Sequence, residues 1–129
     1  MSDVDHPTDI LVVEDDGLLR RMAVEMLIEE GFAADGVSGA AEALSYLRSS
    51  PTIKLLITDI NMPGMNGLDL AKCVREQFGH VRLLIVSGGA PRDAGVLPPA
   101  AEFLQKPFTV PHFLGRVRDL LSDSTAAGG

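Results

Sequence analysis

Cysteine is almost absent from this 129-residue chain, which has Cys73 alone and therefore cannot form an internal disulfide bond. A single thiol fits a reducing, intracellular setting, so we expect a cytoplasmic protein. The acidic start of the sequence lacks the apolar stretch of a secretory signal. No apolar run approaches the roughly 20 residues that span a bilayer, so we expect no membrane partner.

Positive charge is also scarce, because 11 Lys and Arg stand against 18 Asp and Glu, for a formal net charge of -7. This excess of negative charge repels a phosphate backbone, so we expect no direct nucleic-acid binding by this chain. The length fits one compact domain. We expect a flexible N-terminus over 1–8, one domain over 9–122, and a disordered tail over 123–129, which is small, polar and ends in glycine.

Two kinds of segment alternate along the chain. Short runs rich in β-branched residues or leucine are nearly continuous in apolar character, which is typical of strands buried on both faces. Such strands are expected at Ile10–Val13, Phe32–Val37, Ile53–Thr58, Leu83–Val86 and Glu102–Gln105.

The stretches between these runs have the spacing of amphipathic helices. The first covers Leu18–Glu30, and Ser38, Asn66 or Gly67, and Thr109 are suited to cap the next ones. The inward face of the first helix is expected to carry Leu18, Leu19, Met22, Met26 and Leu27.

A βα unit repeated about five times predicts an α/β fold, with a doubly wound five-stranded parallel sheet and helices on both faces (flavodoxin-like). One segment departs from this alternation of strands and helices, because Gly88–Ala101 contains three prolines and three glycines. In a helix, glycine costs about 1 kcal/mol and interior proline about 3 kcal/mol. The fourth helix is therefore expected to be short or disrupted, with one or two turns over Arg92–Leu97.

Polar side chains follow four of the five expected strands, at the sheet edge where ligands of such folds bind. Carboxylates held close together there repel one another by roughly 4 kcal/mol per pair at an effective dielectric near 20. A hard divalent cation such as Mg²⁺, or Mn²⁺ in its place, offsets that repulsion. Such a cation also neutralises a transferring phosphoryl group, and a carboxylate is a competent nucleophile toward it. The residues at this edge are Glu14, Asp15 and Asp16 after the first strand, Asp59 after the third, Ser87 after the fourth and Lys106 after the fifth.

Five motifs in order resemble the receiver domain of bacterial two-component response regulators, whose best-known single-domain member is the chemotaxis regulator. The resemblance extends from about Thr8 to Leu121. The motifs are Ile-Leu-Val-Val-Glu14-Asp15, Asp59-Ile-Asn-Met-Pro-Gly-Met-Asn-Gly67, Ser87, Phe103 and Lys106-Pro107, the last with a cis bond in most family members.

This resemblance implies a role for each matching residue. Asp59 would accept a phosphoryl group from a histidine kinase or a histidine phosphotransfer protein, assisted by Lys106 and Ser87. Ser87 and Phe103 would form a coupled switch that controls a downstream partner or output domain. The chain would be no enzyme beyond self-catalysed transfer and slow autodephosphorylation. The implied Mg²⁺ ligands are the carboxylates of Asp15 and Asp59, the backbone carbonyl of Asn61, and Glu14 through a bound water.

Because three acids are consecutive, the acidic pair of the family could be Glu14/Asp15 or Asp15/Asp16. Arg20, five residues after Asp15, favours the first. Taken singly, these acids could merely open a helix, Ser87 could be a turn serine and Phe103 a core residue.

Three other functions share some of these features with the receiver. A haloacid-dehalogenase-type phosphatase also uses a strand-end aspartate, a lysine and Mg²⁺, but Asn61 stands where its second aspartate should follow Asp59. A flavodoxin-like cofactor binder needs a phosphate loop after the first strand, which this sequence lacks. A non-phosphorylated receiver-like interaction module would not need the intact acid, Asp, Ser and Lys set.

Overall fold

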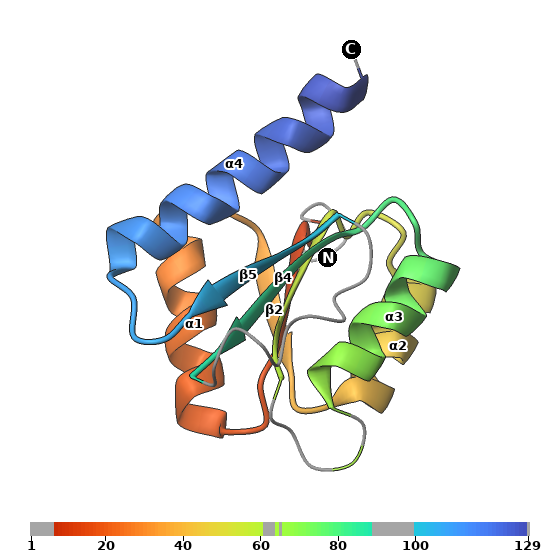
Figure 1. The fold of residues 1–129 in the computed structure, drawn as a ribbon, viewed down its shortest axis with the longest axis horizontal. Helices are drawn as coiled ribbons and strands as arrows, with labels where there is room; N and C mark the ends of the chain where they lie inside the picture. Colours follow the sequence, from red (N-terminus) through yellow and green to blue (C-terminus); the bar gives the residue numbers. More distant parts are fainter. Residues whose placement is uncertain (1–6, 61–63, 65, 89–99, 129) are drawn as a thin grey trace.

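The computed structural model describes residues 7–60, 64, 66–88 and 100–128, with the side chains of 123–128 left aside. Strands and helices alternate along most of this length, as Figure 1 shows. The elements are β1 (Ile10–Val13), α1 (Gly17–Glu29), β2 (Ala34–Val37), α2 (Ala40–Ser49), β3 (Leu55–Asp59), α3 (Gly67–Gln77), β4 (Arg82–Ser87), β5 (Ala101–Gln105) and α4 (Val110–Gly128).

The strands form one sheet in the order β2-β1-β3-β4-β5, and every pairing is parallel. α1 and α4 pack on one face of the sheet, and α2 and α3 pack on the other (Figure 1). The predicted doubly wound α/β fold is therefore confirmed. The order places β3 in the middle, so the carboxyl end of β3 has those of β1 and β4 on either side.

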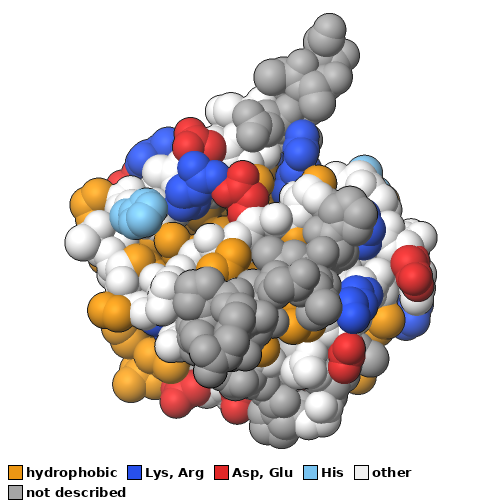
Figure 2. All heavy atoms as spheres, viewed as in Figure 1, with side chains coloured by type: hydrophobic (Ala, Val, Ile, Leu, Met, Phe, Trp, Pro, Cys, Tyr) orange, Lys and Arg blue, Asp and Glu red, His pale blue; other side chains and the backbone are white. Residues whose placement is uncertain are grey.

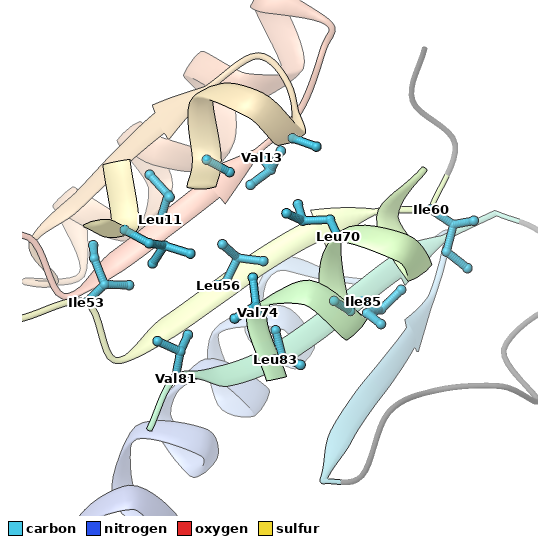
Figure 3. Packing of buried hydrophobic residues seen from close by; sticks show 14 residues of the cluster. Leu11, Val13, Ile53, Leu56, Ile60, Leu70, Val74, Val81, Leu83 and Ile85 are labelled. Atoms are coloured by element: carbon cyan, nitrogen blue, oxygen red, sulfur yellow. The ribbon is translucent and has the colours of Figure 1, made fainter. Parts of the chain in front are cut away.

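Two apolar clusters fill the space between the sheet and its two helix layers. Neighbouring strand residues point to opposite faces, so Leu11 and Val13 join one cluster while Ile10 and Val12 join the other. Figure 3 shows the cluster under α2 and α3, where Leu56 lies at the centre. Burial on both faces explains why β1, β3 and β4 are mostly apolar, since each buried apolar side chain contributes about 1.5–3 kcal/mol.

α1 presents a different face to the sheet from the one predicted. Leu27 is buried, and Ala23, Val24 and Met26 pack against the same cluster. The apolar residues of α1 cover more of its circumference than one contact with the sheet can bury. Three side chains that were expected to point inward are exposed, namely Leu18 by 67%, Leu19 by 45% and Met22 by 50%.

The helix caps follow the sequence in two cases and depart from it in one. Asn66 caps α3 and Thr109 opens α4, and each side chain accepts a hydrogen bond from the backbone N–H three residues later. Ser38 was expected to cap α2, but the N-cap is Gly39, which has no side chain to accept a bond. Glu42 in the first turn reaches back instead, and accepts bonds from the N–H of Ser38 at 2.7 Å and from its hydroxyl at 2.6 Å.

Two further expectations concern the connections and the ends. The short fourth helix expected over Arg92–Leu97 lies outside the described residues. α4 continues to Gly128 and extends past the sheet (Figure 1), whereas the sequence predicts a disordered tail from residue 123. A helix that has already formed extends at low cost, which accounts for the difference. Among the described residues, no helix has the length and apolar character to cross a membrane.

Candidate functional site

The carboxyl edge of the sheet brings together residues from distant parts of the sequence. Asp59 ends the buried strand β3, and its side chain is 13% exposed. Lys106 follows β5 directly and donates from Nζ to Asp59 Oδ2 across 2.8 Å. The peptide bond between Lys106 and Pro107 is cis, as the resemblance implied. Two of the predicted site residues therefore form an ion pair at this edge.

The acids after β1 lie beside this pair. Burial raises the pKa of the Glu14 carboxyl above its ordinary value, and the negative charge of Asp59 acts in the same direction. A hydrogen bond with Asp15 raises this pKa as well. The N–H of Asp16, which donates to Glu14 Oε2 at 3.1 Å, and the charge of Lys106 lower it. Glu14 thus lies within electrostatic reach of Asp59 and within hydrogen-bond reach of Asp15.

This crowding of acids fits a Mg²⁺ site. Within the described part of the chain, no three His, Cys, Asp or Glu side chains are arranged to hold a metal by themselves. Mg²⁺ does not need such a cage, because it usually binds through one or two carboxylates and keeps several waters. The carboxylates of Asp15 and Asp59 would meet that requirement, and both interact with Glu14. Asn61, the fourth expected ligand, lies outside the described residues.

Asp16 has a separate task. Its Oδ1 accepts hydrogen bonds from the backbone N–H groups of Leu18 and Leu19, at 2.9 and 3.0 Å, so it is the N-cap of α1. A carboxylate used in this way is committed to the helix start. The geometry therefore favours Glu14/Asp15 as the acid pair, and the role of the pair remains a prediction.

Gly67 holds the chain close behind Asp59. A Cβ at this position would lie 2.1 Å from the carbonyl oxygen of Asp59, so only glycine allows α3 to begin here. The N–H of Gly67 also donates to the carbonyl of Ile60 at 2.8 Å. Gly64, with φ of 78°, takes a backbone conformation that favours glycine. Two glycines of the Met-Pro-Gly-x-x-Gly motif thus shape the turn that follows Asp59.

The two expected switch residues lie on the neighbouring strands. Ser87 ends β4 and is 1% exposed, and its carbonyl accepts a hydrogen bond from the N–H of Lys106 at 2.8 Å. Phe103 lies opposite Ile85 in the register of β4 and β5, and it packs half-buried against the cluster under α2 and α3. The ring of Phe103 is thus partly covered by this cluster and partly exposed.

A family model for the response regulator receiver domain matches residues 10–118. The chain belongs to this family. It is a receiver domain of the two-component type, which confirms the resemblance found in the sequence.

Named relatives support this membership. The receiver domain is 35% identical over 126 residues to the alkaline phosphatase synthesis transcriptional regulatory protein SphR of Synechococcus elongatus, an alignment that covers 89% of this chain and 49% of that protein. It is 36% identical over 119 residues to the two-component response regulator PhoP of Pseudomonas aeruginosa, covering 90% of this chain and 52% of that protein. The chain thus spans about half the length of these relatives.

Solved structures share the fold. The response regulator TrrA of Thermotoga maritima, in complex with Mg²⁺-BeF, is 30% identical, with a TM-score of 0.79 and coverage of 88% of this chain and 98% of that one. A CheY-like receiver domain protein of Methanospirillum hungatei has a TM-score of 0.86 at 22% identity, covering 94% and 98%, which shows the fold alone. Family membership leaves no support for the phosphatase or the cofactor binder weighed above.

One feature of this receiver domain could not be found from motifs. A cavity of about 290 Å³ lies between α1 and the start of α4, and Asp59 and Lys106 contribute to its lining. Its other walls are mostly apolar and include Leu19 and Met22 of α1. Figure 2 shows hydrophobic side chains gathered on the side of the surface where α1 lies. The signal for it in the sequence is the surplus of apolar residues in α1, which the core does not bury.

Phe108 is a second residue that the motifs missed. It follows the Lys106-Pro107 pair, lines the cavity, and stacks on Phe113 with ring centroids 5.4 Å apart and planes 18° apart. This contact joins the loop after β5 to the first turns of α4. The position of Lys106 is therefore tied to the packing of α4.

Proposed function

We propose that Asp59 is the phosphoacceptor of this receiver domain, that a histidine kinase or a histidine phosphotransfer protein is the donor, and that Mg²⁺ is required. The observation that carries the proposal is the 2.8 Å ion pair between Lys106 and Asp59 at the end of a buried strand. Glu14 and Asp15 beside this pair supply the negative charge that a divalent cation needs. The single cysteine fits a cytoplasmic setting for this reaction.

In the proposed step, a carboxylate oxygen of Asp59 attacks the phosphorus of the donor's phosphohistidine. The phosphorus–nitrogen bond breaks, and the imidazole nitrogen keeps the electron pair. Lys106 already lies beside the reacting carboxylate, so its ammonium can move to a phosphoryl oxygen, and the hydroxyl of Ser87 donates to another. Bound Mg²⁺ would neutralise phosphoryl oxygens. Its proposed ligands are the carboxylates of Asp15 and Asp59, the carbonyl of Asn61, and Glu14 through a water.

The donor is proposed to dock over the amino-terminal half of α1. Its histidine must reach Asp59, which lines the cavity beside that helix. Leu18, Leu19 and Met22 expose apolar surface at this point, and the core makes no use of it. Burial of such side chains against a partner contributes to binding in proportion to the area removed from water.

Phosphorylation is proposed to change the state of Phe103. The phosphoryl group adds about -1.5 to -2 charges and three acceptor oxygens, which draw the Ser87 hydroxyl toward them. The space this vacates would admit the half-buried ring of Phe103. Ser87→Ala should then be phosphorylated without the aromatic NMR shifts that wild type shows at Phe103. Full wild-type shifts in that variant would refute the coupling.

The proposed function is tested by incubation with acetyl phosphate and Mg²⁺. Intact mass should rise by one phosphoryl group in wild type and stay constant in Asp59→Asn. Omission of Mg²⁺ should prevent the gain. An identical gain in wild type and Asp59→Asn would place the modification elsewhere and overturn the assignment.

A further inference from the structure

The side chain of Arg20 lies across the backbone of β2. A Cβ on Gly36 would be 2.8 Å from Cγ of Arg20 and 3.1 Å from its Cδ, so the stem of the arginine rests directly on the glycine. At the far end, Nη1 of Arg20 donates to the backbone carbonyl of Glu14 at 2.9 Å. An arginine of α1 thus reaches back to the acids that precede its own helix, and Gly36 leaves the room for it to do so.

Besides its hydrogen bond with Asp15, Glu14 makes three further hydrogen bonds. Its N–H donates to the carbonyl of Val37 at 3.0 Å, and its carboxylate accepts from the N–H of Asp16 at 3.1 Å. The bond from Arg20 is the third, and it engages the peptide group that joins Glu14 to Asp15. The orientation of this peptide group decides in which direction the Asp15 side chain leaves the chain. Among the three bonds, only the one from Arg20 comes from a side chain outside the acidic segment.

We propose that Arg20 is a positioning residue for the cation site. Held over Gly36, it fixes the Glu14–Asp15 peptide group, so that both carboxylates face the cation before it binds. The inference rests on the proposed function, because it takes Mg²⁺ to bind at these acids. Arg20 contacts neither the cation nor the phosphoryl group. Without it, the acids must be ordered when the cation binds, and that ordering lowers the affinity.

If Arg20 acted through its charge alone, its effect on the affinity for the cation would have the opposite sign. A guanidinium repels a divalent cation, so an arginine that acted through charge alone would weaken binding, and its removal would tighten it. A positioning residue strengthens binding, and its removal weakens it. The sign of the change in affinity therefore separates the two roles.

The test is a titration of the full chain with Mn²⁺, followed by the EPR signal of the free ion, with Mg²⁺ as the competitor. Arg20→Gln removes the contact, and Gly36→Ala keeps every charge but pushes the arginine stem away, along with Cγ2 of Val24, which would lie 3.1 Å from the added Cβ. Two matched controls are Arg21→Gln, an exposed arginine on the same helix, and Gly39→Ala, whose added Cβ meets nothing within 4 Å. We expect the Kd for Mn²⁺ to rise about tenfold in Arg20→Gln and Gly36→Ala, as for other groups that orient metal ligands, and to stay within about twofold in the controls.

Each outcome has a distinct meaning. A wild-type chain that binds no Mn²⁺ refutes the metal site, and with it the proposed function. A wild type that binds, with Arg20→Gln and Gly36→Ala equal to their controls or tighter, overturns only the positioning role. A lower melting temperature without a change in Kd would show Arg20 to be structural and would also overturn it. If Arg20→Gln fails to fold by circular dichroism, Gly36→Ala decides the question.

Discussion

Lys106 and Asp59 are 47 residues apart in the sequence, yet the lysine Nζ lies 2.8 Å from the aspartate Oδ2. The lysine side chain is 36% exposed and the aspartate 13%, so the ammonium sits between solvent and the carboxylate. This ammonium is in direct contact with Asp59, and a phosphoryl group on Asp59 would meet it.

Lys106→Met should slow phosphorylation of Asp59 without preventing folding. The methionine keeps most of the stem but removes the charge-assisted donor that stabilises the transferring group, a loss of about a hundredfold in rate. The measurement is intact mass against time with acetyl phosphate at saturating Mg²⁺. Lys54→Met is the control, because Lys54 is 58% exposed and lies 4.0 Å from Asp9, away from the site. Equal rates in the two variants would remove Lys106 from the proposed chemistry.

Gly67→Ala should lower the free energy of unfolding by about 1–3 kcal/mol, the range for forcing extra atoms into a packed site. The added Cβ would meet the carbonyl of Asp59 at 2.1 Å, so the turn behind the acceptor must shift and phosphorylation should slow as well. Gly115→Ala in α4 is the matched control, since its Cβ meets nothing within 4 Å. That change should stabilise the helix by about 0.5–1 kcal/mol. Urea unfolding of both variants checks the sign of each change in the free energy of unfolding. A Gly67→Ala variant as stable as wild type would refute the close contact.

Met22→Glu should reduce transfer from a histidine phosphotransfer protein while leaving acetyl phosphate reactivity unchanged. A charge in the apolar surface beside the cavity should cost the protein donor about tenfold in kcat/KM, as loss of an interface anchor does. Ile28→Glu is the control, because Ile28 is 54% exposed near the other end of the same helix. If kcat/KM for the donor falls equally with both variants, or with neither, the donor does not dock where we propose.

Tyr46→Phe should destabilise the fold by about 1–2 kcal/mol at neutral pH, by the loss of two hydrogen bonds. The hydroxyl donates to Asp35 Oδ2 at 2.7 Å and lies 3.0 Å from Thr8 Oγ1. Burial, together with Asp35, raises the pKa of Tyr46. Its stabilisation is therefore fully present below the unfolded value of about 10 and is lost as pH rises through the folded value. Urea unfolding should show a difference between variant and wild type that shrinks above about pH 10, and a constant difference would contradict this.

The sequence predicts the sheet and the edge that carries the site because both depend on short-range signals. Strands such as Leu55–Asp59 are buried on both faces, so they are apolar along most of their length, and parallel strands bring their carboxyl ends together. The location of Asp59 beside Lys106 follows from those two rules. Their roles in phosphoryl transfer remain predictions.

What the sequence does not predict is decided by three-dimensional contacts. Apolar residues cover a wide part of the surface of α1. Only the packing of this helix on the sheet determines that Leu27 is buried and Met22 is exposed. Ser38 has the chemistry of a cap, yet its N–H and its hydroxyl both donate to the carboxylate of Glu42. The contact of Arg20 with Gly36 joins two elements whose relative placement no local pattern contains.

β3 is hydrogen-bonded to β1 on one side and to β4 on the other. A local fluctuation can fray an outer strand, but it cannot release the middle one without breaking both ladders. Amide protons of Ile57 and Thr58 should therefore exchange only through global unfolding. The carboxylate of Asp59 should therefore keep its position until the whole domain unfolds, and damage to either outer strand should not release it.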